Sequence, residues 1–270
     1  MRYIFCAIIS SLSFVFSPLE SKTLFSESND IFHTLVYLDE DTLFVFDLDN
    51  TLIEHAQYLG SDQWFTHKIV HLIKQGVEPD DAVRIAISQL IIIHDYSEMR
   101  FVDPAIPDLL HEMQQKNVPM VGLTKRAPCL CERTLEQVEP LQLDLSKTTP
   151  IQEELTFHDL GGTTLKKGII FVGDGLEKGP VFLAYLQKLE RLPKTVVVID
   201  DKMNHLQNIA RSLEPTGIDF VGIRYGGADE RVKAFNPEIA DLQWKHMQMI
   251  LSDEQALHLL QLENPSSAGE

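Results

Sequence analysis

Residues 42–51 read TLFVFDLDNT, an apolar run that ends in two aspartates one residue apart. A short run of bulky apolar residues is typical of a buried strand, and a carboxylate is costly to bury without a partner. Side chains two positions apart in an extended segment point the same way, so we expect Asp47 and Asp49 to face one point beyond the strand. Two like charges that close raise each other's pKa unless a cation lies between them. The pair therefore predicts a site for a hard divalent ion with oxygen ligands, and Mg²⁺ is the expected cofactor.

Further apolar segments along the chain predict the rest of a sheet. Each is short, continuously apolar and separated from the next by residues with helical spacing, which is typical of a parallel sheet covered on both faces. The predicted fold class is therefore α/β, a Rossmann-like parallel sheet with helices on both faces. The expected strands are 42–49, 118–124, 168–174, 195–201 and 218–225, and the expected helices include 103–117, 178–192 and 204–217.

Polar side chains gather at the ends of these predicted strands. Asp47 and Asp49 follow the first strand, Thr124 ends the second, and Asp200 and Asp201 end the fourth. Ligands of open parallel sheets bind at the carboxyl ends of the strands. The sequence thus places one polar site at this edge of the sheet.

Two stretches are longer than the connections of a simple α/β sheet. Residues 53–99 exceed the dozen or so residues that a crossover needs, and they carry two helical patterns with Ser61 and Asp80 or Asp81 as N-cap candidates. We expect a small helical cap inserted after the first strand, although a helix pair packed on the flank of the sheet is the alternative. Residues 140–167 alternate around two glycines and indicate a β-hairpin or flap.

The N-terminus has the layout of a secretory signal peptide. Arg2 precedes an apolar run over residues 3–16, which is shorter than the roughly 20 residues of a bilayer span. We expect residues 1–21 to be this signal, with cleavage between 17 and 22, an exported protein, periplasmic or secreted, and no stable membrane insertion afterwards. An uncleaved anchor or a buried first helix is the alternative. The core would then comprise 22–52 and 100–260, the cap 53–99, and a flexible tail 261–270.

Composition limits the partners. The chain of 270 residues has 23 basic and 40 acidic side chains and a formal charge of -17, which opposes binding to nucleic acid or to an anionic membrane surface. A small phosphorylated substrate would need a metal ion and lysines to reverse this potential locally. Cys129 and Cys131 are too close in sequence for an unstrained disulfide, so we expect free thiols.

The order and spacing of these motifs resemble the haloacid dehalogenase-like (HAD-like) superfamily of phosphotransferases, over about residues 42–225. Four motifs occur in the family's order, each at a predicted strand end or helix start. The segment LGSDQWF at 59–65 also resembles a group of exported bacterial members of unknown function. The motif residues are Asp47, Asp49 and Thr51 in DLDNT, Thr124 in GLTKR, Lys178 in EKGPVFLAYL, and Asp200 and Asp201 in VVVIDDKMN.

The resemblance implies a chemistry for each position. Asp47 would attack phosphorus to form an aspartyl-phosphate, and Asp49 would act as general acid and base. Thr124 would hydrogen-bond a phosphoryl oxygen, and Lys178 would balance negative charge. The substrate-binding set would be Thr51, Thr124, Lys125 and Lys178, and the metal set Asp47, Asp49, Asp200 and Asp201.

Simpler structural roles remain open for several of these residues. Thr124 would then cap a helix, Lys178 would be a surface lysine and Asp201 an N-cap. Lys125 and Arg126 fit helix-surface charges as well as substrate contacts.

A second alignment also remains open. Asp174 in FVGDG would be the metal ligand, with Lys166 or Lys167 as the balancing lysine, but no helix would then follow that lysine. The histidines lack metal-ligand spacing, and His55 is given no role.

The function expected from the residues and the resemblance is a Mg²⁺-dependent phosphomonoester hydrolase. Phosphotransfer to another acceptor shares its first step and stays open. A non-catalytic exported binding or effector protein that keeps the fold is the main alternative, although both aspartates of the first motif are intact. Dehalogenation is a further alternative, and the acidic pair at 200–201 favours phosphorus chemistry over it. The substrate and the oligomeric state are not indicated.

Overall fold

The computed structural model describes residues 21–173, 175–247 and 251–263. Residues 1–20 of the expected signal segment, the alternative ligand Asp174, and the last seven residues lie outside the described residues. Helix α9 runs to Glu263, so the first three residues of the expected tail belong to a helix. Within the described ranges, no helix is long and apolar enough to cross a bilayer.

The molecule is built on one mainly parallel sheet of eight strands in the order β1-β10-β9-β2-β5-β8-β7-β6. The predicted α/β fold class is confirmed, and all five expected strands pair in parallel. Sequence patterning missed β1, a parallel edge strand with mostly exposed side chains. The parallel strands are β1 (Thr23–Ser28), β2 (Thr42–Phe46), β5 (Met120–Thr124), β8 (Ile169–Phe171), β9 (Thr195–Asp200) and β10 (Asp219–Tyr225).

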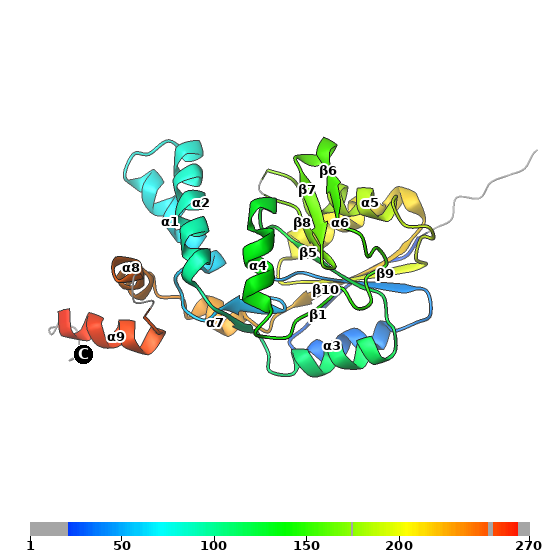
Figure 1. Cartoon of the computed structure of the whole chain (residues 1–270), viewed down its shortest axis with the longest axis horizontal. Helices are drawn as coiled ribbons and strands as arrows, with labels where there is room; N and C mark the ends of the chain where they lie inside the picture. The colour runs from blue at the N-terminus through cyan, green and yellow to red at the C-terminus, as the bar shows by residue number, and fades with distance from the viewer. Residues whose placement is uncertain (1–20, 174, 248–250, 264–270) are drawn as a thin grey trace, which may run out of the picture.

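Alternation along the strands divides the core into two layers. Phe44 and Phe46 of β2 point to one face, whereas Leu43 and Val45 point to the other, and all four are buried. Helix α3 packs on the first face and helices α5 and α6 on the second (Figure 1). The bounds are η1 (Ile31–Tyr37), α3 (Ile106–Gln115), α5 (Lys178–Leu186), α6 (Met203–Leu213) and η4 (Glu214–Thr216).

The expected hairpin within residues 140–167 forms the other end of the sheet. Strands β6 (Leu155–Phe157) and β7 (Thr163–Lys166) pair antiparallel, and β7 pairs antiparallel with β8. The turn between β6 and β7 holds η3 (His158–Leu160) and two glycines with positive φ. Before it come η2 (Pro128–Leu130) and α4 (Cys131–Val138), where Cys129 and Cys131 are free thiols as expected.

The helical insertion begins and ends with a short strand, β3 (Ile53–His55) and β4 (Met99–Phe101). These two strands pair antiparallel. Between them, α1 (Asp62–Lys74) and α2 (Pro79–Tyr96) form a helical hairpin that projects away from the sheet (Figure 1). Ser61 caps α1 as expected, since its side chain accepts a hydrogen bond from the Trp64 N–H. The expected cap of α2 was wrong. Glu78 is its N-cap residue and Pro79 follows it, which leaves both aspartates in the first turn.

Three C-terminal helices extend from the sheet to this insertion: α7 (Asp229–Lys233), α8 (Pro237–Lys245) and α9 (Asp253–Glu263) (Figure 1). Gln243 on α8 accepts a hydrogen bond from the Leu59 N–H at 2.9 Å, and the rings of Trp64 and Trp244 lie 6.4 Å apart. Arg231 on α7 donates to the carbonyl oxygens of His55 and Ala56. The end of the chain is therefore packed against the start of the insertion.

Candidate active site

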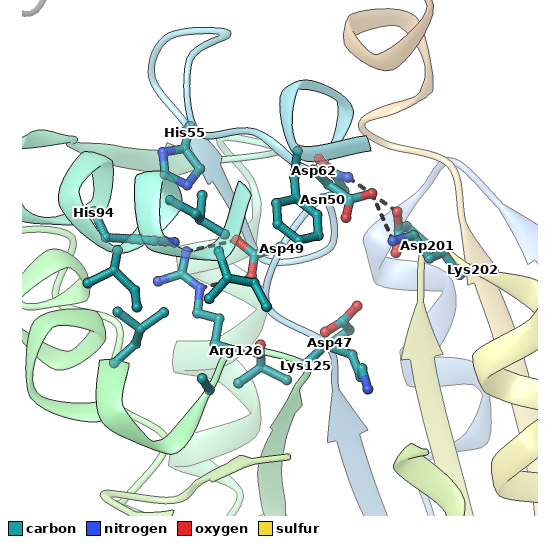
Figure 2. Close-up of a pocket in the computed structure, with 18 of the residues that line it drawn as sticks. Asp47, Asp49, Asn50, His55, Asp62, His94, Lys125, Arg126, Asp201 and Lys202 are labelled. Atoms are coloured by element: carbon teal, nitrogen blue, oxygen red, sulfur yellow. Dashed lines mark hydrogen bonds and ion pairs between the residues drawn. The ribbon is translucent and has the colours of Figure 1, made fainter. Parts of the chain in front are cut away.

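A cavity of about 220 Å³ opens at the carboxyl ends of the strands, under the helical insertion (Figure 2). Asp47 follows β2, Thr124 ends β5, Asp200 ends β9 and Lys178 begins α5. The right-handed crossovers of a parallel sheet bring these four ends to the same edge. The residues that the sequence places at strand ends are thus neighbours in space.

Lys178 lies between two buried carboxylates. Its Nζ atom is 2.8 Å from Asp47 Oδ1 and 2.6 Å from Asp200 Oδ2, and the lysine is 2% exposed. Burial alone would lower the pKa of Lys178, but the carboxylates of Asp200 and Asp47 raise it above its usual value. Lys178 is therefore a fixed positive charge inside the site and not a surface lysine.

The two carboxylates differ in their surroundings. Burial, reinforced by the charge of Asp200, raises the pKa of Asp47 well above its ordinary value although Lys178 opposes it. Burial would also raise the pKa of Asp200, yet Lys178 and then His205 lower it to about 2. Asp200 has more hydrogen-bond donors around it than Asp47, because Asp200 also accepts from the Lys202 N–H at 2.8 Å. Asp200 is thus the permanent anion that holds Lys178 in place.

A close helix contact positions Lys178. The next residue is Gly179, whose N–H donates to Asn208 Oδ1 of α6 at 2.6 Å. A Cβ atom at Gly179 would lie 2.5 Å from the carbonyl oxygen of Asn208, far inside contact distance. The absence of a side chain therefore lets the first turn of α5 approach α6 and brings Lys178 under the strand ends.

The cavity also has the donors that a hard cation needs. Both contacts that the described residues make to the Asp47 carboxylate, from Lys178 and from the Leu48 N–H, use Oδ1. Asp201 lines the cavity and accepts from Asn50 Nδ2 at 3.3 Å. Burial and the charge of Asp200 raise the pKa of the Asp201 carboxyl to about 7, although Lys202 opposes the shift.

Asp47, Asp200 and His205 also carry ligand atoms within 4.8 Å of one another. In that group, however, Asp200 is committed to Lys178 and to His205, whose Nδ1 lies 3.0 Å from Asp200 Oδ1. Mg²⁺ prefers oxygen ligands. The residues present fit such an ion best through Asp47 and Asp201, with Asp200 supporting Lys178.

Asp49 is held by an arginine. Arg126 Nη2 lies 2.7 Å from Asp49 Oδ1 and Arg126 Nε lies 2.8 Å from Oδ2, a bidentate pair that Figure 2 shows beside His94. The other side of the guanidinium donates to Thr134 Oγ1 and Gln137 Oε1 of α4. Burial would raise the pKa of Asp49, but Arg126 lowers it well below its ordinary value. In this arrangement Asp49 is an ionised carboxylate.

The remaining expected substrate contacts have different surroundings. Thr124 is buried at the base of the cavity, and its Oγ1 accepts from the Arg126 N–H at 3.1 Å. Lys125 borders the cavity, but its Nζ donates to the carbonyl oxygens of Gly173 and Leu176. Thr51 is fully buried, and its hydroxyl has no hydrogen-bond partner among the described residues.

The sequence matches a family model described as a protein of unknown function (DUF2608) over residues 25–257. The chain belongs to this family. It is 26% identical over 236 residues to a protein of Chlamydia trachomatis named "Putative outer membrane protein", with 87% of each chain covered. A Chlamydia pneumoniae protein with the same description is 26% identical over 226 residues, covering 84% of this chain and 85% of its own.

Solved structures give a more distant match. A Had-superfamily hydrolase from Ehrlichia chaffeensis aligns with a TM-score of 0.41 and 15% identity, over 73% of this chain and 98% of that one. Such values say nothing about chemistry, which has to come from the residues of the site.

Sequence patterning missed several residues of this site in the DUF2608 chain. For Arg126 the sequence leaves a helix-surface charge and a substrate contact both open, but the side chain is buried against Asp49. His205 reaches Asp200 from the first turn of α6. His55 and His94 are buried with ring centroids 5.0 Å apart, although 39 residues separate them in sequence. Both features depend on the path of the chain, after Thr124 for Arg126 and through the insertion for the histidine pair.

Proposed function

We propose that this protein is a HAD-like, metal-dependent phosphomonoester hydrolase that acts through an aspartyl-phosphate on Asp47. One observation carries the proposal. Lys178 Nζ is shared between Asp47 and Asp200, and Asp47 lines the cavity together with Asp49 and Thr124. A buried nucleophile beside a fixed cation, facing a second carboxylate, suits the transfer of a charged phosphoryl group.

In the first step, Asp47 Oδ2 forms a bond to phosphorus as the bond from phosphorus to the ester oxygen breaks. The Thr124 hydroxyl donates a hydrogen bond to one phosphoryl oxygen, and Lys178 offsets the negative charge gathered at Asp47. The ester oxygen leaves as an alcohol after taking a proton from Asp49. In the second step, a water attacks phosphorus, gives its proton to Asp49 and releases inorganic phosphate and free Asp47. An alcohol in place of that water would give phosphotransfer.

Asp47 and Asp201 are the residues that would hold Mg²⁺. The ion supplies charge neutralisation for the phosphoryl oxygens when bound. The protein's own residues then orient the reactants. Lys178 keeps Asp47 aimed at the cavity, and Asp200 keeps Lys178 in place.

Asp49 needs a change of partner during this cycle. Its carboxylate form, as held by Arg126, is the form that accepts a proton from the attacking water. To donate a proton in the first step, Asp49 has to be protonated and turned from Arg126 to the ester oxygen. The helical insertion over the cavity acts as a cap that excludes bulk water while this happens.

Hydrolysis of 4-nitrophenyl phosphate by residues 22–270 tests the proposal, measured with Mg²⁺ and with EDTA. We expect metal-dependent activity that falls to background in Asp47→Asn and falls roughly 10²- to 10⁴-fold in Asp49→Asn. Asp241→Asn, at an exposed position on α8, is the matched control and should keep full activity. Activity that survives Asp47→Asn would contradict the covalent route.

A non-catalytic binding protein is the second candidate, and the Asp49–Arg126 pair favours it. A general acid held in a bidentate ion pair is also what a site that binds phosphate without cleaving it would have. Under this alternative, Mg²⁺ with BeF₃⁻ would raise the melting temperature although no aryl phosphate is hydrolysed.

We also propose that the protein is exported. The basic residue and apolar run at the N-terminus and the description of the chlamydial relatives support this. A C-terminally tagged full-length chain should appear outside the cytoplasm in a shortened form. Deletion of residues 3–16 should retain it inside, and an unchanged distribution of the deletion variant would contradict export.

A further inference from the structure

The cavity has two unlike walls. Its base carries the charged groups of the proposed reaction, whereas its roof is formed largely by one side of α2. Phe65 of α1 and Leu130 of η2 also line the cavity and add to its apolar surface. The volume of about 220 Å³ is below the roughly 300–1,000 Å³ of pockets for drug-sized ligands, so the space suits a small molecule.

The apolar residues of α2 lie on separate faces. Successive residues of a helix turn by about 100°, which groups Ala82, Ala86 and Ile93 on one side, all of them buried. Ile87 and Ile91 lie about 140° away by the same count, and they line the cavity half-buried. The first face of α2 is apolar because it packs inside the insertion. The second face is also apolar, although it lines the cavity.

The polar groups around this roof already have protein partners. His94 Nδ1 lies 3.3 Å from Gln137 Oε1, and Lys202 Nζ lies 2.8 Å from Asp62 Oδ2. The exception among the described residues is His55, which is 4% exposed and whose Nδ1 lacks a hydrogen-bond partner. On this side of the cavity a bound molecule would thus meet mainly the apolar side chains of the roof.

These walls select among phosphomonoesters. A sugar hydroxyl that packs against Ile87 and Ile91 gives up its hydrogen bonds to water without gaining new ones, which weakens binding. Apolar surface of the ligand that is buried there strengthens binding. A second anionic group on the substrate would lie near lysine and arginine side chains of the cavity. Among the described residues, these side chains already form ion pairs with carboxylates. On the basis of the proposed function, we propose that the group esterified to phosphate is a small, uncharged and mainly apolar alcohol or phenol, and not a sugar, a nucleoside or a bisphosphate.

Binding of phosphonates, which cannot be hydrolysed, tests this inference without turnover. Titration calorimetry in the presence of Mg²⁺ would compare benzylphosphonate with 3,4-dihydroxybutylphosphonate and with methylphosphonate as the minimal anion. We expect benzylphosphonate to bind at least about tenfold more tightly than the dihydroxy compound, since one methylene in an apolar pocket is worth roughly 10- to 200-fold. Equal affinities, or no binding of benzylphosphonate, would overturn the inference.

Single substitutions locate the effect on the roof. Ile87→Ala and Ile91→Ala should each weaken benzylphosphonate binding about tenfold and leave methylphosphonate binding unchanged. Ile92→Ala is the matched control, because Ile92 is the adjacent residue on α2, is 44% exposed and does not line the cavity. Unchanged benzylphosphonate affinity in both roof variants would place the preference elsewhere and overturn the inference.

Hydrolysis of benzyl phosphate, glycerol 3-phosphate, glucose 6-phosphate and adenosine monophosphate separates the two proposals. Preferred hydrolysis of benzyl phosphate supports both. Hydrolysis of the sugar phosphates at equal or higher kcat/KM would overturn the apolar preference and leave the hydrolase intact. Selective benzylphosphonate binding with no hydrolysis of any ester would overturn the hydrolase and leave the apolar pocket intact.

Discussion

Arg126 and Asp49 form a bidentate ion pair in which the guanidinium is almost fully buried and the carboxylate keeps about a third of its side chain exposed. Gln137 links this pair to the insertion, because it accepts from Arg126 and donates to the carbonyl oxygens of His94 and Ser97 at the end of α2. The proposed acid–base residue is therefore connected to the roof of the cavity through two side chains.

Replacement of this arginine tests the pair. Arg126→Ala should lower the free energy of unfolding by about 2 kcal/mol, somewhat less than the 3–5 kcal/mol of a fully buried pair, because Asp49 remains partly solvated. Urea denaturation measures the change. Arg191→Ala is the control, since Arg191 makes the same two-oxygen contact with Asp41 on the surface. A loss no larger than that of the control would mean that burial adds nothing to this pair.

Lys178 should be more important still for stability. Lys178→Met leaves the buried carboxylates of Asp47 and Asp200 without their shared cation, which should cost about 3–5 kcal/mol. Adding Asp200→Asn to this variant should recover part of the loss, because it removes one of the two charges. Lys166→Met is the control, since Lys166 pairs with exposed Glu132 and Glu154, and its urea midpoint should stay near that of the wild type. A double variant less stable than Lys178→Met would contradict charge repulsion as the cause.

The buried histidine of the roof should make stability depend on pH. Burial, and next the guanidinium of Arg126, lower the pKa of His94 from its ordinary 6.5 to about 3. Between these values the unfolded chain binds a proton that the folded chain does not, so stability falls as the pH falls. The slope from this group approaches about 1.4 kcal/mol per pH unit.

The variant His94→Gln should therefore show a shallower fall of unfolding free energy between pH 6 and pH 4 than the wild type, on the order of 1 kcal/mol per pH unit. Above pH 7 the two dependences should run parallel, because His94 is then neutral in both states. Identical slopes below pH 6 would show that His94 is not held neutral.

Because α5 and α6 are in close contact, replacing glycine by alanine at this contact should change stability in the direction opposite to that expected from helix propensity. Alanine usually stabilises a helix over glycine by roughly 0.5–1 kcal/mol. Gly179→Ala should instead destabilise the protein by about 2 kcal/mol, because its Cβ would press on the backbone of Asn208. Phosphonate affinity should fall as well, since Lys178 is the preceding residue. Pro180→Ala, at an exposed position in the same turn, should change stability by less than about 1 kcal/mol.

Local patterns in the sequence explain which parts of the fold could be foreseen. Strands β2, β5 and β9 are continuously apolar, and an acid or a threonine ends or follows each of them, so both their existence and their polar ends were predicted correctly. β1 is different, because it lies at an edge with exposed side chains and gives no apolar run. Its pairing with β10, almost 200 residues later, is a property of the folded sheet and not of the segment.

The same distinction holds within the site. Lys178 could be placed through the resemblance to the HAD-like superfamily, because it stands at a predicted helix start before an apolar strand with two acids, in the order of the family's motifs. The partner of Asp49 could not, since the path of the chain after Thr124 decides whether Arg126 turns inward. The approach of His55 to His94 likewise depends on how the insertion folds back over the strand ends.

The contacts between the C-terminal helices and the insertion also set an order of folding. During synthesis the insertion leaves the ribosome well before Gln243 and Trp244, which pack against Leu59 and Trp64, have been made. In the same way, strand β1 can pair with β10 only after β10 has been made. Such sequence-distant contacts close late. The start of the insertion therefore reaches its final packing only after residues 243–244 have been made.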